Sequence, residues 1–296
     1  MINTKNAAAT LQDALESVPM ASEIIVVDMQ STDNTKEIAR KFTPKIFNHP
    51  DTHYVEPARN FALRKATEEW TLILDADECL SASLQEKLAS CIEKATEQGS
   101  VCIYLPRKNF VFGAWLKHTG WWPDYLPRLF RTGSVDWPEK IHALPQVQGT
   151  SWYAPASELY CIEHKNYSSI DEYFEKMGRY TSAAAAEAKL PQTTTAEDVL
   201  STFFSEFLRR FFLQEGFKDG VRGSALSLLQ STYQVLTQVK IWELSNHSEG
   251  SEAPAQSIVA VQHITRDLNY WVADYYAQRT TGLVRIFWRI RRFLRR

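Results

Sequence analysis

The sequence predicts an α/β fold, with a mostly parallel sheet and flanking helices, followed by a helical C-terminal region. Short apolar runs alternate with helix-like stretches over residues 1–105, a pattern typical of βα units. Two of these runs, at 23–28 and 71–74, lead to a carboxylate. Open α/β sheets bind their ligands at the carboxyl ends of their strands. From residue 168 onward the apolar residues recur at helical spacing.

The elements of the N-terminal half follow in order. Leu11, Leu15 and Val18 lie at helical spacing and predict a helix over 10–18. The apolar run at 23–28 predicts a buried strand. The same reasoning predicts a helix over 36–42, a strand over 46–48, a helix over 58–69, a strand over 71–74, a helix over 84–98 and a strand over 101–105. Strands separated by helices pair in parallel through right-handed crossovers.

The chain changes character after residue 109. Residues 109–145 are rich in Phe, Trp, Pro, Gly and basic residues with little periodicity, which predicts an irregular region lying over the sheet. Helices are predicted over 171–190, 196–214 and 224–244, and a polar, turn-rich stretch follows them. We therefore expect four segments: a sheet domain at 1–165, a helical region at 166–244, a linker at 245–257 and a C-terminal helix at 258–296.

Composition limits the class of protein. The chain has 296 residues, of which 44% are hydrophobic, so it can bury a substantial core. A formal net charge of -2 argues against a general nucleic-acid binder. Its four cysteines show no close pairing and no zinc spacing, which favours a reducing, cytoplasmic location. No run approaches the roughly 20 apolar residues that span a bilayer.

The acidic stretch after the run at 71–74 is the strongest functional signal. Asp75, Asp77 and Glu78 follow a buried strand directly. In an extended segment Asp75 and Asp77 point to the same side, and paired carboxylate oxygens suit Mg²⁺ or Mn²⁺. The alternative is an acidic turn, or a helix N-terminus where acids favour the dipole.

The C-terminal segment predicts a basic amphipathic helix. From Arg279 to Arg296 it contains seven arginines and no acid. On a helical wheel one face carries Leu283, Ile286, Phe287, Ile290, Phe293 and Leu294, and the opposite face carries Arg285, Arg289, Arg292 and Arg296. Such a helix lies in an anionic membrane interface. The alternative is a helix that docks on an acidic protein surface.

Several motifs together resemble the bacterial family 2 glycosyltransferases of the GT-A fold, in particular the branch that extends lipopolysaccharide core and related cell-envelope glycans. The resemblance lies in the stretches 23–28, 31–35, 58–63, 74–78, 120–125 and 128–131. It is strong over residues 3–145 and is weaker but visible later, as in the Gly-Phe-Lys-Asp-Gly sequence of 216–220.

The resemblance implies roles for the donor-side residues. Asp77 would bind the metal, Asp75 would contact the ribose or the metal, and His142 would be a further metal ligand. Asp28 would meet the nucleobase, with Thr4 lining the same pocket. Arg59 would contact the diphosphate, since Arg pairs well with phosphate oxygens. The alternatives are a turn cap for Asp28, a surface position for Arg59 and a structural hydrogen bond for His142.

The acceptor side holds the expected general base. Asp124 ranks first, because its aromatic surroundings can raise its pKa by desolvation, and Glu139 and Asp136 compete with it. The alternative is a structural ion pair of Asp124 with Arg128 or Arg131. Trp121 and Trp122 would stack against a sugar ring, with Arg128 in the same acceptor block, although aromatic side chains usually pack in cores.

Two departures from the family pattern stand out. The family opens with a strand before an Asn-Thr turn, and here Ile2-Asn3-Thr4 leaves most of that strand out, which suggests a truncated or late start. The family commonly has Glu after the His of a Val-His-Glu block, where this chain has Ala143.

The expected function is the transfer of a sugar from a nucleotide-diphosphate sugar, UDP-sugar favoured, to a cell-envelope glycan or a lipid-linked acceptor. The expected enzyme is a metal-dependent, inverting transferase of the hexosyltransferase type, peripheral on the cytoplasmic face of the cell membrane. The competing function is a nucleotide-sugar-binding protein that has lost catalysis, motivated by the short first strand and Ala143. An aspartate-dependent phosphatase would require Gly-Thr after its Asp-x-Asp, and Glu78-Cys79 follows here.

Overall fold

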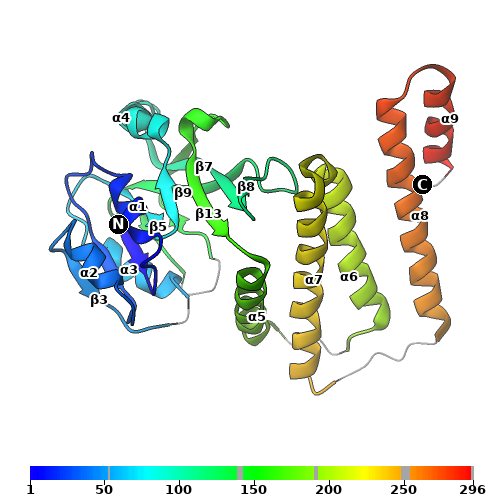
Figure 1. The fold of residues 1–296 in the computed structure, drawn as a ribbon, viewed down its shortest axis with the longest axis horizontal. Helices are drawn as coiled ribbons and strands as arrows, with labels where there is room; N and C mark the ends of the chain where they lie inside the picture. The colour runs from blue at the N-terminus through cyan, green and yellow to red at the C-terminus, as the bar shows by residue number, and fades with distance from the viewer. Residues whose placement is uncertain (53, 139–142, 190–192, 248–253, 295–296) are drawn as a thin grey trace. The chain divides into compact units, whose positions relative to one another are not determined.

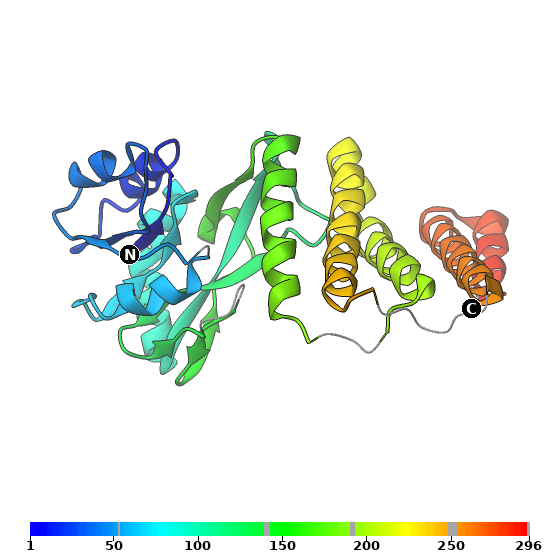
Figure 2. The ribbon, with the colours of Figure 1, turned by 90° about the horizontal axis from the view of Figure 1, so that it is seen from below.

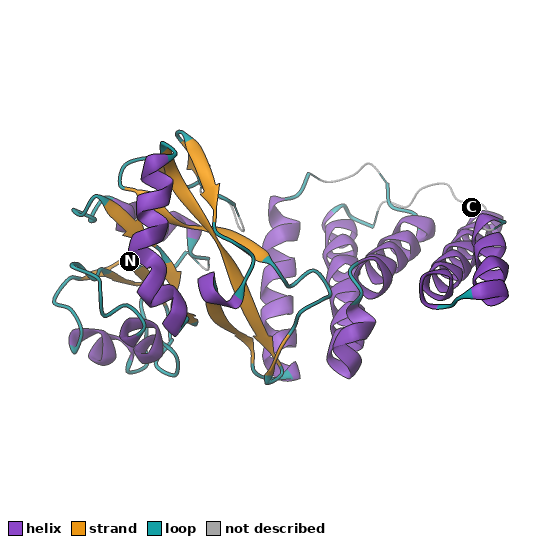
Figure 3. Cartoon of the chain, turned by 90° about the horizontal axis from the view of Figure 1, so that it is seen from above, coloured by secondary structure: helices purple, strands orange, loops and turns teal. Residues whose placement is uncertain are grey.

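The computed structural model describes residues 1–52, 54–138, 143–189, 193–247 and 254–294. The chain divides into two compact units (Figure 1). The first, the α/β unit, comprises Met1–Trp115 and Trp121–Ser168. The second, the helical unit, comprises Leu116–Gly120 and Ser169–Arg296. Every strand of the described residues lies in the α/β unit, as Figure 3 shows in orange.

A four-stranded parallel sheet forms the first half of the α/β unit. Its strand order is β3-β2-β1-β5. The strands are β1 (Ile2–Thr4), β2 (Val26–Asp28), β3 (Ile46–Asn48) and β5 (Leu74–Asp75). The helices of this half are α1 (Leu11–Glu16), α2 (Thr35–Arg40) and α3 (Glu56–Leu63). The predicted α/β class with a parallel sheet and a helical C-terminal region is confirmed.

The first strand is short but central in its sheet. β1 pairs in parallel with β2 on one side, with Thr4 opposite Asp28, and with β5 on the other, with Asn3 opposite Asp75. These registers bring the ends of three strands together at one edge of the sheet. Thr4, Asp28 and Asp75, all expected to bind the nucleotide, lie at those ends.

A second, mixed sheet was not predicted. Its order is β4-β9-β7-β13-β6, with β12 and β8 also paired to β7. Its strands are β4 (Trp70–Leu72), β6 (Glu78–Leu80), β7 (Ser100–Val111), β8 (Ala114–Trp115), β9 (Asp124–Arg131), β12 (Thr150–Tyr153) and β13 (Ile162–Tyr167). A small hairpin of β10 (Val135–Asp136) and β11 (Gln146–Val147) completes the unit.

The strand predicted over 71–74 is two strands in different sheets. Thr71 pairs with Phe130 of β9 in the mixed sheet, whereas Leu74 pairs with Ile2 of β1 in the parallel sheet. Ile73 lies between the two and donates its backbone N–H to the carbonyl of Arg128 at 2.8 Å. The acidic stretch therefore begins in one sheet, with Asp75, and ends in the other, with Glu78.

The prediction of an irregular region over 109–145 is wrong for much of its length. β7 continues to Val111, and β9 is an eight-residue strand hydrogen-bonded to β7 and β4. Leu129 and Phe130 of β9 are buried among apolar neighbours. The pattern was hidden because Pro127 and charged Arg128 interrupt the apolar alternation, and Arg128 is buried through ion pairs rather than through apolar contact.

Helix α4 (Ala82–Glu97) closes the core of the α/β unit. Ser81 caps it by accepting a hydrogen bond from the backbone N–H of Leu84. Leu84, Leu88 and Cys91 pack into one apolar cluster with residues of α1 and β7. The helix predicted over 84–98 is confirmed to within two residues.

The helical unit contains α5 (Ile170–Glu187), α6 (Ala196–Leu208), α7 (Gly220–Leu244), α8 (Pro254–Arg279) and α9 (Gly282–Phe293). Helices α5 and α6 each pack against α7 (Figure 2). A π-helical turn, η2 (Arg209–Leu213), and a 3-10 turn, η3 (Gly216–Asp219), join α6 to α7.

The single helix predicted over 258–296 is two helices, α8 and α9, separated at Thr280 and Thr281. The linker predicted over 245–257 is replaced by α8 from Pro254 onward, and 248–253 lie outside the described residues. Within the described helices, none is both long and apolar enough to cross a membrane.

Candidate active site

A continuous polar network lies where the two sheets meet, and we call it the strand-end network. It joins α3, the turn between β5 and β6, and strands β7, β9 and β13. Its members are Arg59, Asp75, Asp77, Glu78, Arg107, Asn109, Asp124, Arg128 and His164. Hydrogen bonds and ion pairs connect these side chains in one series, in the order Arg59, Asp75, Arg128, Glu78, Arg107, Asp124, Asn109, His164 and Asp77.

Asp75 is held by two guanidinium groups. Its Oδ1 accepts from Arg59 at 2.8 Å and its Oδ2 accepts from Arg128 at 2.5 Å. Burial raises the pKa of the Asp75 carboxyl, but the charges of Arg128 and Arg59 lower it by more, so the net pKa is well below the usual range. Arg59 is only 8% exposed and lies over the ring of Trp137. The alternative of a surface Arg59 is therefore excluded.

Glu78 is the fully buried centre of the network. Its Oε1 accepts from Arg128 at 2.5 Å and from Arg107 at 3.0 Å. Its Oε2 accepts a hydrogen bond from the backbone N–H of Asp75 at 3.1 Å. This bond joins the two ends of the turn Asp75–Glu78, which we call the acidic turn. A buried carboxylate is tolerable only with such partners. The charge on Glu78 thus keeps Arg107 and Arg128 in place behind the turn.

Asp124, the first-ranked general base, forms an ion pair with Arg107. Its Oδ2 accepts from Nε of Arg107 at 2.8 Å and from Nη2 at 2.7 Å, and also from Nδ2 of Asn109 at 2.9 Å. The structural alternative named Arg128 or Arg131 as partner, which is wrong: Arg128 binds Asp75 and Glu78, and Arg131 pairs with Glu69. The Asp124 side chain is 25% exposed, so solvent and substrate can reach it.

His164 connects Asp124 to Asp77 through Asn109. Asn109 donates both amide hydrogens, to Asp124 and to the carbonyl of Trp121, so its Oδ1 is left to accept. The 2.7 Å contact between this Oδ1 and Nδ1 of His164 is therefore donated by the imidazole. This assigns the hydrogen to Nδ1 and turns Nε2 toward Oδ2 of Asp77, 3.5 Å away.

The expected nucleobase residues lie side by side and are buried. Asp28 is fully buried, and its Oδ2 accepts from the backbone N–H of Ser31 and pairs with Lys36, both at 3.1 Å. Its Oδ1 and the Oγ1 of neighbouring Thr4 are buried without a hydrogen-bond partner among the described residues. A buried carboxylate oxygen without a partner costs free energy, which a ligand or water donor would recover.

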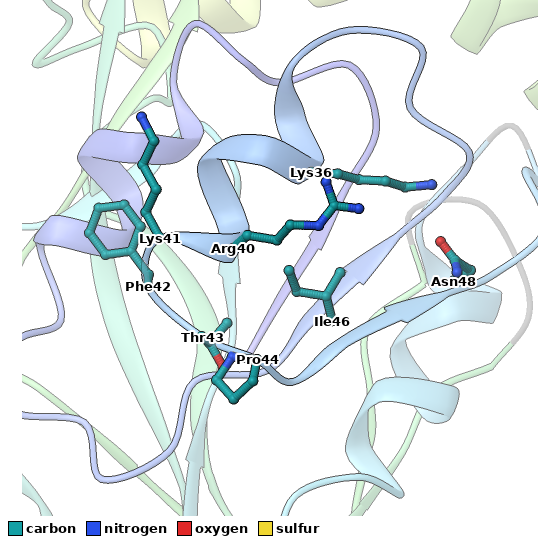
Figure 4. Close-up of a pocket in the computed structure, with 8 residues that line it drawn as sticks. All are labelled: Lys36, Arg40, Lys41, Phe42, Thr43, Pro44, Ile46 and Asn48. Atoms are coloured by element: carbon teal, nitrogen blue, oxygen red, sulfur yellow. The ribbon is translucent and has the colours of Figure 1, made fainter.

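A hollow of about 660 Å³ lies beside these residues. Lys36 and Arg40 project from α2 on one side of it, and Asn48 lies on β3 on another (Figure 4). Asn48 is paired in register with Asp28, so the hollow adjoins the carboxyl end of β2. The two cationic side chains make this part of the surface suitable for an anion. Lys36 also forms the ion pair with Asp28, so it lies between the hollow and that carboxylate.

The remaining predicted residues have the following places. Trp121 lies edge-on to Tyr167, and Trp122 lies edge-on to Trp115, with both rings partly exposed. Arg128 is 2% exposed, and its described contacts are with Asp75 and Glu78, so its contact with an acceptor stays a prediction. Asp136 ends β10 and is exposed. Glu139 and His142 lie outside the described residues.

Sequence reasoning did not assign Glu78, Arg107, Asn109 and His164 to the site. Arg107 and Asn109 are two residues apart in β7 and therefore point to the same face of the strand. A strand predicted beyond residue 105 would have placed them together. His164 faces Glu78 across the β13–β6 pair, a pairing that only the fold shows. Among the described residues, no three His, Cys, Asp or Glu side chains already converge as a metal cluster.

A parallel sheet with ligand-type side chains at the carboxyl ends of its strands defines the class of open α/β ligand-binding proteins. Residues 1–144 match the family model described as glycosyl transferase family 2. Residues 1–144 are therefore a glycosyltransferase domain of this family.

Individual proteins are similar to the chain over different lengths. A glycosyltransferase of Rickettsia felis is 41% identical over 88 residues, which are 29% of this chain and 31% of that protein. The lipopolysaccharide core biosynthesis glycosyltransferase LpsC of Rhizobium meliloti is 24% identical over 250 residues, 80% of this chain and 89% of that protein. The crystal structure of S. aureus TarS 1–349 in complex with UDP aligns with a TM-score of 0.39 and 16% identity, covering 89% of this chain and 88% of that one.

Proposed function

We propose that the protein transfers a sugar from a nucleotide-diphosphate sugar to a cell-envelope glycan with the help of Mg²⁺ or Mn²⁺. The family supports glycosyl transfer, and the similarity to LpsC supports a lipopolysaccharide-type acceptor. The single observation that carries the metal-dependent mechanism is the pair of Asp77 and His164 in the strand-end network. The hexosyl nature of the sugar is part of this proposal.

The donor atoms of Asp77 and His164 fit a divalent cation. With its hydrogen on Nδ1, the His164 ring turns Nε2 toward Oδ2 of Asp77, 3.5 Å away, so that both atoms could bind one cation. A metal-binding His typically donates its other ring N–H to a protein acceptor, as His164 does to Asn109. Mg²⁺ bound together with phosphates usually has one or two carboxylates as its protein ligands, and Asp77 would supply one. His164 would thus take the place that the sequence suggested for His142.

Asp75 is suited to orient the donor rather than to bind metal alone. Both of its oxygens already accept from guanidinium groups, which fixes the carboxylate next to the turn that carries Asp77. Arg59 and Arg128 bring positive charge to the same place, and this charge would favour a bound diphosphate. When bound, the metal would stabilise the negative charge of the leaving diphosphate.

Asp124 is the proposed general base. The acceptor hydroxyl oxygen forms a bond to the anomeric carbon while the bond from that carbon to the diphosphate oxygen breaks and its electron pair leaves with the nucleotide. The hydroxyl proton passes to Asp124. Arg107 and Asn109 hold the carboxylate by its Oδ2 and fix its direction. A single displacement of this kind inverts the anomeric centre.

Asp28 is the proposed reader of the nucleobase. A carboxylate only accepts hydrogen bonds, so its unpartnered Oδ1 fits a base with a ring N–H, which uracil and guanine have and cytosine lacks. Lys36 beside it donates and fits a neighbouring carbonyl oxygen. Uracil presents its ring N–H between two carbonyls, which favours a UDP-sugar.

A nucleotide screen tests the donor site. UDP with Mn²⁺ is expected to raise the melting temperature of the protein, because a ligand that binds the native state stabilises it by mass action. At a UDP concentration 100 times Kd the gain is about 2.7 kcal/mol. CDP should give a smaller shift than UDP, and chelation with EDTA should remove most of the UDP effect. Equal melting curves with and without UDP and Mn²⁺ would contradict the proposal.

We also propose that the protein attaches to the cytoplasmic face of the membrane through α9. This helix packs on α8 by stacking Trp288 against Tyr276 and by an ion pair of Arg292 with Asp274 at 2.6 Å. The opposite side of α9 is apolar and open: Leu283, Ile286, Phe287, Ile290, Phe293 and Leu294 are each more than half exposed. Arg292, expected on the basic face opposite these residues, pairs with Asp274 of α8.

Removal of residues 282–296 is expected to release the protein from anionic vesicles. Arg285 and Arg289 contribute about 1 kcal/mol each near an anionic surface, so changing both to Gln should weaken attachment at low salt and matter less at high salt. Changing Arg292 to Gln should weaken it less, because Arg292 is already paired with Asp274. Flotation with phosphatidylglycerol vesicles measures attachment, and neutral vesicles are the control. A parent chain that ignores anionic vesicles at low ionic strength would make α9 a protein-docking helix.

A further inference from the structure

The loop Leu116–Gly120 links the two units along the chain. It packs with the helical unit, although Trp115 before it and Trp121 after it belong to the α/β unit. Trp121 and Trp122, which the proposed function assigns to the acceptor, follow this loop directly, and Asp124 comes two residues later. The loop therefore determines where the acceptor segment, residues 121–124, begins.

Asp219 of η3 holds this loop through several hydrogen bonds. Its carboxylate accepts from the backbone N–H of His118 at 2.8 Å and of Lys117 at 3.4 Å. It also contacts Nδ1 of His118 at 2.8 Å and accepts from Oγ1 of Thr119 at 3.3 Å. The Asp219 side chain is only 8% exposed, so these contacts are shielded from water.

Residues around η2 also hold the loop, and together with Asp219 they form what we call the seat of the loop. The backbone N–H of Thr119 donates to the carbonyl of Gln214 at 3.0 Å, and Arg210 donates to the carbonyl of Thr119 at 2.8 Å. Thr119 is fully buried in a left-handed backbone conformation, with φ of 63°. A non-glycine residue holds this conformation only where its surroundings enforce it.

Glycines bring the loop and the seat close together. A Cβ on Gly216 would lie 2.8 Å from a side-chain carbon of Thr119, and a Cβ on Gly120 would lie 2.5 Å from the side chain of Gln214. Gly120 also has a φ of +79°, which a side chain rarely adopts. The Gly-Phe-Lys-Asp-Gly sequence of 216–220 is thus built to receive residues 117–120.

We propose that Asp219 is a positioning residue for the acceptor segment, through the loop 117–120. The contacts of Asp219 hold residues 117–120, and these residues lead directly along the chain into the acceptor segment, residues 121–124. The proposed donor site consists of β1, β2 and the acidic turn and does not include this loop. Loss of Asp219 should therefore impair the acceptor step and leave the donor step intact. The acceptor part of this inference rests on the proposed function.

Hydrogen exchange of the full chain tests the positioning without any activity. In an Asp219→Ala variant, the amides of Lys117 and His118 should exchange at least about tenfold faster, because they lose their acceptor, and the increase should extend through 121–124. Asp219→Asn keeps one carbonyl acceptor, so its amide exchange rates should lie between those of Asp219→Ala and those of the parent. Asp267→Ala, which removes an exposed carboxylate from α8, is the matched control. Unchanged exchange at 121–124 in Asp219→Ala would overturn the proposal.

Kinetics add the functional readout. With UDP-N-acetylglucosamine and Mn²⁺, transfer to lipopolysaccharide extracted from a strain that lacks this chain should fall roughly 10- to 100-fold in Asp219→Ala, as expected for a misplaced acceptor. Hydrolysis of the same donor by water, without lipopolysaccharide, should stay within twofold of the parent. Equal losses of transfer and hydrolysis would overturn the positioning role. A parent that neither binds nor hydrolyses UDP-N-acetylglucosamine would exclude that donor, and the exchange result at 121–124 would still decide the role of Asp219.

Discussion

Replacing Glu78 with glutamine is expected to destabilise the α/β unit by about 3–5 kcal/mol. Glu78 is fully buried between Arg107 and Arg128, so the change removes a negative charge and leaves two buried guanidinium groups with less compensation. The size of the effect comes from the lost charge compensation of Arg107 and Arg128, which keep only Asp124 and Asp75 as charged partners, rather than from the strength of one ion pair. Thermal unfolding followed by circular dichroism should show a large drop in melting temperature.

The chain offers a matched control on the adjacent strands. Glu69 pairs with Arg131 at 2.9 Å, but both side chains are more than half exposed. Glu69→Gln makes the same chemical change at the surface, where an ion pair contributes about 0–1 kcal/mol. Similar small losses in both variants would show that the strand-end network is not held together by the charge of Glu78.

The pH dependence of stability follows from the low pKa of Asp75. Arg128 and Arg59 lower this pKa in the folded state, so the carboxylate stabilises the fold fully above the unfolded pKa of about 3.9. This contribution is lost only as the pH falls below that value toward the lower folded pKa. The Asp75 carboxylate should therefore stay ionised at neutral and mildly acidic pH, and the melting temperature should not fall through loss of its charge in that range.

Local patterns predicted the parallel part of the fold well. The helices at α1, α2 and α4 and the strand Ile46–Asn48 were found where apolar spacing placed them. These elements bury one apolar face each, so their periodicity is visible in the sequence. Thr4, Asp28 and Asp75 were also found together at strand ends, because parallel strands align their carboxyl ends at one edge.

The mixed sheet could not be predicted from local pattern. β9 carries Arg128 in its buried middle, and only long-range ion pairs with Asp75 and Glu78 make that burial possible. The segment Trp70–Asp75 changes sheet at Ile73, which depends on pairing with β9 and β1 rather than on its own residues. The same long-range pairings bring His164, Asn109 and Arg107 to the site, so their part in it was missed.

Replacing Asp77 with asparagine is expected to remove metal-dependent donor binding and to lower transfer by a factor of roughly 100 to 1,000, the usual cost of losing one group that stabilises a developing charge. Asparagine keeps the shape of the side chain but not its charge, and a neutral amide is a much weaker ligand for Mg²⁺ or Mn²⁺. The fold should be retained, because the Asp77 side chain is 31% exposed and lies on the turn between β5 and β6. Asp13→Asn is a suitable control, since Asp13 is an exposed carboxylate paired with Lys165.

Calorimetric titration of UDP into the parent and the Asp77→Asn variant, with and without Mn²⁺, tests whether Asp77 binds the metal. We expect Mn²⁺ to tighten UDP binding at least tenfold in the parent and in Asp13→Asn, and to have no effect in Asp77→Asn. UDP affinity that is independent of Mn²⁺ in the parent, or equally dependent on it in Asp77→Asn, would contradict the assignment of the acidic turn as the metal and donor site.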